Sequence, residues 1–463
     1  MMEWTNFNPA TGEPIATYSF ASAEEIERGV AQLDQEFHRF KKLTVHERMA
    51  GISRLGALLR KHKSSLAGLM AQEMGKPIRQ GLGEIEKCFL TCDFYAEMGD
   101  KFMVSQEVVA HYGQTWLVKR PLGVILAIMP WNFPFWQVIR CAVPAWLAGN
   151  VVLLKHAPSV QGCARRIQEL VHEAFSSAPL LQIPMTNTGT DSVIADARVK
   201  AVSFTGSSRV GRHLASLAGL HLKKTVLELG GSDPYIILAD ADLSLAAELC
   251  VKARFLNSGQ SCVAAKRFLI HQSVYSEFKS KVIEHIKKLK VGDPTLATTD
   301  IGPLAEERLR AAVLSQLALS VEKGAQLVDV GAPTMEALLA KGFFMAPTLV
   351  ENLSTEMPLF AEETFGPVMP LMPVASYEQA IQLANQSQYG LGAAIFTARP
   401  DLAWPAAVED LDVGMIVFNE TIQSDPRVPF GGIKESGWGR ELGPQGVMEF
   451  INLKTMGFSK DSI

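Results

Sequence analysis

Apolar residues in the first part of the chain recur with the spacing of amphipathic helices. Over Ala23–Phe40 and 45–74 they return at i, i+3 and i+4 with charged residues between them, which predicts helices in both ranges. The segment 104–120 changes to alternation around a Tyr-Gly-Gln turn and predicts a two-stranded antiparallel ribbon.

From Gly123 onward, short apolar runs alternate with helical patterns. The runs read, in order, GVILAIMP, NVVLLKHAP, AVSFTG, KTVLELGG and DPYIILAD. Helical patterns are expected at 161–175, 209–218 and Leu243–Phe255. Apolar runs without alternation are typical of parallel strands with both faces covered by helices, so this part is expected to form a covered parallel sheet.

A second α/β block is expected after residue 262. It has a strand at Arg267–His271 and helices at 274–289 and 306–323. The last segment, 447–460, is one more alternating strand, which can pair with the 104–120 ribbon in a small sheet open to another subunit.

Composition narrows the class of protein. A chain of 463 residues with 48% apolar and 20% charged residues is globular and long enough for two or three domains. The formal net charge of −4 gives no excess of positive charge to attract a nucleic acid or an anionic membrane, so neither is expected as a partner. No apolar run reaches the ~18 residues of a membrane span, and the first residues lack a signal-peptide pattern. The six cysteines form no CxxC pair, so we expect no metal site and a cytoplasmic protein.

Two positions in the first block could hold an anionic ligand. In FTGSSRVG (204–211), Gly206 would form a turn at the end of a strand, and Ser207 and Ser208 would cap a helix whose N–H groups bind anions. The spacing is not GxGxxG, and a plain capped turn is the alternative. Lys155 ends the apolar run NVVLLK, so it is expected at the carboxyl end of a strand, the sheet edge where ligands bind. There it could contact a ribose or a phosphate. The alternative, a lysine exposed to solvent, is the commoner outcome.

Three further residues carry the types needed for acyl chemistry. Asn132 stands between two prolines in PWNFP and could donate to an oxyanion, or simply cap the next helix. Glu228 precedes a Gly-Gly pair and could serve as a general base, or be a surface acid. Cys262 follows the turn residues SGQS and could be a nucleophile, or a buried apolar filler.

Taken together and in order, these segments resemble the aldehyde dehydrogenase superfamily. The motifs are PWNFP (130–134), FTGS (204–207), ELGG (228–231), GQSC (259–262), EETFGPV (362–368) and PFGGIKESGWGRE (429–441). The resemblance implies an α/β fold of two Rossmann-like parallel-sheet domains with a small antiparallel oligomerisation sheet. It places an NAD(P)-binding domain at 1–103 and 122–229, a catalytic domain at 230–440, and an oligomerisation ribbon and tail at 104–121 and 441–463. A homodimer or homotetramer would follow.

The resemblance also implies a role for each residue. Cys262 would attack the aldehyde, Asn132 and the Cys262 N–H would hold the oxyanion, and Glu228 would activate water to hydrolyse the thioester. The expected cofactor contacts come from six residues: Trp131, Lys155, Gly206, Ser207, Glu363 and Phe365. Because Cys262, Glu228 and Asn132 are all present, an inactive cofactor-binding protein is disfavoured.

The substrate prediction rests on fewer residues. Arg140 stands where succinate-semialdehyde dehydrogenases of this superfamily have a carboxylate-binding arginine, although a helix arginine in a surface pair is the alternative. A second arginine of one bacterial group is replaced by Leu256, with Arg254 and Arg427 as the nearest other donors. The loop SDPRVPFGG resembles a shorter bacterial group, in which Asp425 and Arg427 would close over the substrate.

We therefore expect oxidation of succinate semialdehyde to succinate through a cysteine thiohemiacetal and thioester. A broad-specificity dehydrogenase of short aldehydes is the alternative, with Arg140 structural. Pro158 stands where NAD-selective members often have a glutamate that repels a 2′-phosphate, so NAD is expected as cofactor, with NADP tolerated.

Overall fold

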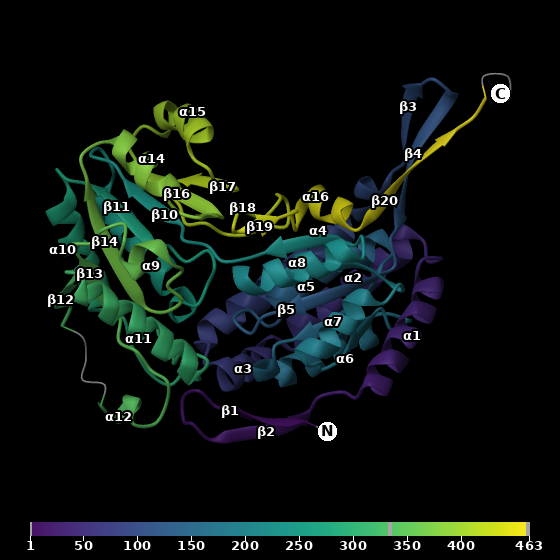
Figure 1. Cartoon of the computed structure of the whole chain (residues 1–463), viewed down its shortest axis with the longest axis horizontal. Helices are drawn as coiled ribbons and strands as arrows, with labels where there is room; N and C mark the ends of the chain where they lie inside the picture. Colours follow the sequence, from purple (N-terminus) through teal and green to yellow (C-terminus); the bar gives the residue numbers. More distant parts are fainter. Residues whose placement is uncertain (1, 332–335, 460–463) are drawn as a thin grey trace.

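The computed structural model describes residues 2–331 and 336–459, so residue 1 and residues 460–463 of the predicted tail lie outside it. Figure 1 shows two α/β bodies side by side and a thin sheet that projects from one of them. No helix in the described part of the chain is both long enough and apolar enough to cross a membrane.

The first body is built on a six-stranded sheet in the order β19-β9-β8-β5-β6-β7. All neighbours are parallel except β19, which runs antiparallel to β9. The strands are β5 (Val124–Met129), β6 (Val151–His156), β7 (Leu180–Gln182), β8 (Val199–Thr205), β9 (Lys224–Glu228) and β19 (Gly437–Trp438). Every residue of β5 is buried, which explains why its sequence is a continuous apolar run.

Helices cover both faces of this sheet. They are α1 (Ala23–Phe40), α2 (Val45–Lys61), α3 (Lys63–Met74), α4 (Ile78–Met103), α5 (Trp136–Ala148), α6 (Gln161–Ala174), α7 (Asn187–Ala195) and α8 (Ser208–Leu220), with a 3₁₀ turn η1 (Pro158–Val160). Capping boxes start α1 at Ser22 and α2 at Thr44. The helical pattern predicted over 45–74 corresponds to two helices, α2 and α3, because the backbone departs from helical geometry at His62.

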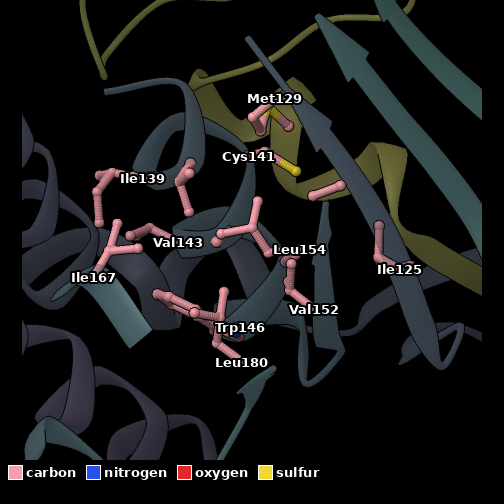
Figure 2. Packing of buried hydrophobic residues seen from close by; sticks show 14 of the residues in the cluster. Ile125, Met129, Ile139, Cys141, Val143, Trp146, Val152, Leu154, Ile167 and Leu180 are labelled. Atoms are coloured by element: carbon pink, nitrogen blue, oxygen red, sulfur yellow. The ribbon is translucent and has the colours of Figure 1, made fainter. Parts of the chain in front are cut away.

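The core of the first body lies between the central strands and α5. Figure 2 shows Val152 and Leu154 of the sheet close to Val143 and Trp146 of α5. All residues of α5 are buried. A mainly apolar helix that is buried on every side belongs in the interior, and α5 therefore fixes the site residues at its start against the sheet.

The second body contains a seven-stranded sheet in the order β12-β13-β14-β11-β10-β16-β17, parallel except for β12. Its strands are β10 (Pro234–Ile237), β11 (Arg267–His271), β12 (Gln326–Val328), β13 (Thr348–Glu351), β14 (Val368–Val374), β16 (Gly392–Phe396) and β17 (Met415–Phe418). Its helices are α9 (Leu243–Phe255), η2 (Leu256–Gly259), α10 (Tyr275–Ile286), α11 (Glu307–Glu322), α12 (Glu336–Leu339), α13 (Pro358–Ala361), α14 (Tyr377–Asn385) and α15 (Pro400–Asp410). The predicted strand at Arg267–His271 and helix at Leu243–Phe255 are confirmed.

The remaining strands link and extend the two bodies. A hairpin of β1 (Glu3–Phe7) and β2 (Pro14–Ser19) starts the chain, and β15 (Tyr389–Gly390) pairs with β18 (Ile433–Lys434). After β18 the chain returns to the first sheet at β19, so the segment predicted as catalytic, 230–440, ends on that sheet. The short α16 (Gly443–Glu449) then leads into β20 (Ile451–Gly457).

The projecting sheet consists of β3 (Gln106–Ala110), β4 (Gly113–Pro121) and β20, in the order β20-β4-β3. Both pairings are antiparallel, so the predicted ribbon and its pairing with the last strand are confirmed.

Candidate active site

Cys262 lies on a loop with a constrained backbone. Directly after α9, Asn257, Ser258 and Gly259 all have positive φ, of 53°, 57° and 77°. A Cβ at Gly259 would collide with the carbonyl group of Gly366. Three successive left-handed residues are costly, and the surrounding contacts must hold them in place. The loop thus presents Cys262 in one fixed position.

A buried lysine that sequence analysis did not identify supports this loop. The Lys266 ammonium donates to the carbonyl oxygens of Ser261 and Cys262 at 2.9 and 2.7 Å. It also lies 3.5 Å from a carboxylate oxygen of Glu363. The only sign of this contact in the sequence is that Lys266 stands four residues after Cys262. Lys266 orients the backbone around Cys262 and brings a positive charge close to the thiol.

Asn132 belongs to the other body and reaches the same loop. It lies after β5, and its Nδ2 donates to the carbonyl oxygen of Gln260 at 3.1 Å. Asn257 in turn donates to the Asn132 carbonyl oxygen at 2.8 Å. Asn132 does not cap α5, because the N–H groups of Phe135 and Trp136 at its start donate to Glu84 instead. Since an amide nitrogen carries two hydrogens, one remains for a ligand beside Cys262.

Glu228 is buried at the carboxyl end of β9 and is only 3% exposed. Its Oε1 atom has no hydrogen-bond partner in the described residues. Burial raises the pKa of this carboxyl well above its ordinary value, and the nearby Glu441 raises it further against the pull of Arg140. An interior carboxyl of this kind is a candidate general base, and the surface-acid alternative is excluded.

The thiol of Cys262 differs from the other cysteines. Five of the six cysteines are buried, whereas Cys262 is partly exposed. Desolvation raises the pKa of its thiol to about 11, although Arg140 and Lys266 favour the thiolate. It lies on the wall of a cavity of about 280 Å³, so the buried-filler alternative does not hold for Cys262.

The cavity beside Cys262 lies between α4, α5, α9 and the loop 421–424. Its lining is mostly apolar, with a few charged and polar groups, and includes Lys87, Phe133, Trp136, Arg140, Leu256, Ser424 and Phe430. A mainly apolar cavity with few convergent polar groups is the usual form of a small-molecule site.

Arg140 borders this cavity, but its charge is already paired. It forms an ion pair with Glu441, and both side chains are 2% exposed. Its Nη2 atom donates to Thr205 Oγ1 at 3.3 Å, and its guanidinium lies 4.6 Å from the ring centroid of Phe430. The expected surface pair is therefore a buried pair, and its acidic partner lies about 300 residues away in the sequence.

Asp425 and Arg427 are not on the cavity wall. Arg427 is exposed, and its Nε donates to Asp425 at 2.8 Å. Their neighbour Ser424 does line the cavity. Arg254 is unavailable to a substrate, because its guanidinium donates to main-chain carbonyls, including Ala265 O at 2.9 Å.

A second cavity, of about 360 Å³, lies at the carboxyl ends of β6 and β8. Lys155, Pro158, Gly206 and Arg209 contribute to its wall beside the apolar Val210. No ion pair of the described residues includes Lys155, and burial lowers the pKa of its amine. An unpaired amine at the edge of an apolar cavity fits the ribose and adenine of a dinucleotide.

The start of α8 differs from the predicted cap. Ser207 is the N-cap residue but makes no side-chain capping bond. Ser208 does not cap either, because its hydroxyl donates to the Glu435 carbonyl oxygen at 2.9 Å. The first N–H groups of α8 are thus not satisfied by these hydroxyls, which suits a helix end that binds a phosphate.

The other expected cofactor residues, Trp131, Glu363 and Phe365, are not on the wall of either cavity. The rings of Trp131 and Phe365 meet edge to face, with their centroids 5.9 Å apart. Glu363 accepts a hydrogen bond from the Gly231 N–H at 3.1 Å. These residues come from both bodies, as a site for the reactive end of a dinucleotide requires.

Comparisons with known proteins agree with this geometry. Residues 2–456 match the aldehyde dehydrogenase family. A probable succinate-semialdehyde dehydrogenase [NADP(+)] of Synechocystis sp. is 41% identical over 98% of this chain and 99% of its own. The succinate semialdehyde dehydrogenase [NAD(P)+] Sad of Escherichia coli is 40% identical over 97% of each chain. A crystal structure of succinic semialdehyde dehydrogenase from Streptococcus pyogenes with NADP+ has a TM-score of 0.94 and 34% identity, and covers 99% of this chain and 100% of that one.

Proposed function

The chain belongs to the aldehyde dehydrogenase family, and we propose that it oxidises succinate semialdehyde to succinate with NAD(P)+. The observation that carries this proposal is the position of Cys262, a partly exposed thiol held by a rigid loop at the wall of a small cavity. The names of the similar enzymes support the acid semialdehyde as substrate.

Cys262 is proposed to form the covalent intermediate. Its thiolate sulfur attacks the aldehyde carbon, and the carbonyl oxygen becomes an oxyanion. The free hydrogen of Asn132 Nδ2 and the Cys262 N–H, which has no acceptor among the described residues, then stabilise this oxygen. When bound, NAD(P)+ supplies the hydride acceptor that converts the thiohemiacetal into a thioester.

Glu228 is proposed to release the acid. As a carboxylate it takes a proton from a water molecule, whose oxygen attacks the thioester carbon and expels the Cys262 thiolate. The raised pKa of Glu228 suits a base that must accept a proton near neutral pH. The acid product leaves, Cys262 is again a thiolate, and Glu228 must release the proton that it took from water before the next turnover.

The cofactor site is proposed to accept both dinucleotides. Lys155 would bind the adenine ribose, Gly206 and Ser207 would border the pyrophosphate, and Glu363 would bind the nicotinamide ribose between Trp131 and Phe365. Pro158 lines the cavity beside Lys155 and carries no charge to repel a 2′-phosphate. We propose NAD+ as the preferred cofactor with NADP+ tolerated, and a homo-oligomeric cytoplasmic enzyme.

One observation favours a second candidate function. Because Glu441 neutralises Arg140, that arginine has less charge to offer a substrate carboxylate. If nothing else in the cavity binds an anion, the protein would be a dehydrogenase of short aldehydes without acid preference.

The test compares kcat/KM for succinate semialdehyde and butyraldehyde, which share a four-carbon chain and differ at the far end. A bound carboxylate should favour the acid by roughly 30- to 1,000-fold. A ratio near one would establish the broad-specificity alternative. Arg140→Ala then measures how much of the preference Arg140 provides, and Cys262→Ala, which removes the nucleophile, is the inactive control.

A further inference from the structure

Lys87 is a charged residue of the substrate cavity to which no role has been assigned. It lies on α4 and lines the cavity together with Cys262 and Arg140. Its Nζ atom donates to Ser424 Oγ at 2.7 Å and lies 4.6 Å from the ring centroid of Trp136. The side chain is only partly exposed, and its amine points toward the loop that borders the cavity.

The carboxylates near Lys87 are all committed to other cations. Glu84 pairs with the buried Lys76, and its Oε1 accepts the Phe135 N–H at 2.9 Å. Asp425 pairs with Arg427 on the exposed loop. Among the described residues, no ion pair includes Lys87. Asp425 and Glu84 are close enough to favour the charged form of Lys87, but neither forms an ion pair with it, so the ammonium has no direct counter-charge.

This contrast separates Lys87 from the other cations of the cavity. Arg140 is held in a buried ion pair with Glu441. Lys252 on α9 also lines the cavity, but it is exposed and therefore solvated. Lys87 is neither paired nor fully solvated, and an ammonium has three hydrogens, of which Ser424 takes one. A carboxylate of the substrate would take the others and supply the missing negative charge.

We propose that Lys87, held by Ser424, binds the carboxylate of the acid semialdehyde and is a main determinant of the preference for an acid substrate. This inference rests on the proposed function and names the residue that reads the far end of the substrate. Arg140 then contributes mainly by holding Glu441 and closing the cavity.

The experiment measures kcat/KM for succinate semialdehyde and butyraldehyde in the wild type, Lys87→Met and Lys252→Met. Methionine keeps the length of the side chain and its contact with Trp136 but removes the charge. For Lys87→Met we expect kcat/KM for the acid to fall about tenfold to a hundredfold, the range for a charge-assisted hydrogen bond, with butyraldehyde within about twofold. Lys252→Met, the matched removal of an exposed lysine, should leave the substrate preference unchanged.

The outcomes are distinguishable. If the wild type shows no acid preference, the proposed function fails and the inference with it. If the wild type prefers the acid and Lys87→Met keeps that preference, or if Lys252→Met or Arg140→Ala alone removes it, only the inference is overturned. An equal loss for both substrates would assign Lys87 a structural role and would also overturn it.

A binding measurement covers the case in which Lys87→Met folds poorly. Lys87→Gln keeps a polar group near Ser424 and serves as the second variant. Succinate should inhibit butyraldehyde oxidation by the wild type competitively, and its inhibition constant should rise about tenfold or more in either variant. An unchanged inhibition constant would contradict the proposal.

Discussion

At the residue scale, burial works against the ionised forms of both reactive groups. Desolvation raises the pKa of the Cys262 thiol to about 11 and raises that of the Glu228 carboxyl. Both groups act as anions, and a raised pKa means that the anion forms only as the pH rises. We therefore expect kcat/KM for butyraldehyde to increase from about pH 6 to about pH 9. Steady-state rates across this range check it, and a flat or falling profile would contradict it.

Titration of Lys87 should make the preference for the acid substrate fall, not rise, with increasing pH. Burial lowers the pKa of its amine to about 8, with Arg140 lowering it further and Asp425 and Glu84 opposing the shift. A lysine loses its charge as the pH rises through its pKa. The ratio of kcat/KM for succinate semialdehyde to that for butyraldehyde should thus decline above about pH 8. In Lys87→Met the ratio should be low and independent of pH, and a decline that persists there would assign it to another group.

The sequence identified reactive residues more readily than their partners. Cys262, Asn132 and Glu228 stand next to turn residues in recognisable motifs, so they could be proposed from sequence. The ion pair of Arg140 with Glu441 joins positions about 300 residues apart, and no local pattern contains it. Lys87 looks like any charged position of an amphipathic helix until the cavity is seen.

At the scale of elements, burial made several strands predictable, because a strand that is buried on both faces requires a continuous apolar run. Strands β5, β6 and β8 are almost wholly buried, so their apolar runs stood out. The break between α2 and α3 falls at His62, without a glycine or proline to mark it. The β1–β2 hairpin has only one buried residue in each strand and no clear alternation, and it was not predicted.

The loop before Cys262 offers a prediction at this scale. Gly259→Ala would strain a residue with φ of 77° and force its Cβ against the Gly366 carbonyl. We expect the free energy of unfolding to fall by about 1–3 kcal/mol, and kcat to fall by roughly tenfold or more because Cys262 is displaced. Urea denaturation and steady-state rates measure the two effects.

The matched control is Gly68→Ala in α3. A Cβ at Gly68 would have no neighbouring atom within 4 Å. Alanine in the middle of a helix should leave stability unchanged or raise it by about 0.5–1 kcal/mol, with normal activity. If Gly259→Ala behaved like this control, the loop would not be the rigid support that its geometry indicates.

At the scale of the whole molecule, the projecting sheet is the part least explained by a single chain. Figure 1 shows it extending away from both bodies. Six of the seven residues of β20 are exposed, on both faces of the strand. Apolar side chains among them include Leu453 and Met456, and Val109 on β3 is fully exposed. A thin sheet with open edges and uncovered apolar residues is marginal in water, which supports the proposed homo-oligomer, in which another subunit would cover it.

The last prediction concerns this covering subunit. Leu453 and Met456 lie on opposite faces of β20, because their positions differ by three and successive side chains of a strand alternate between its faces. Leu453→Glu combined with Met456→Glu places a charge on each face and should convert a homo-oligomer into monomers at micromolar concentration. Light scattering after gel filtration measures the mass. Leu220→Glu, at the exposed end of α8, adds a charge elsewhere and should leave the mass unchanged. If the double variant kept the wild-type mass, subunits would associate through another surface, and the projecting sheet would need a different partner.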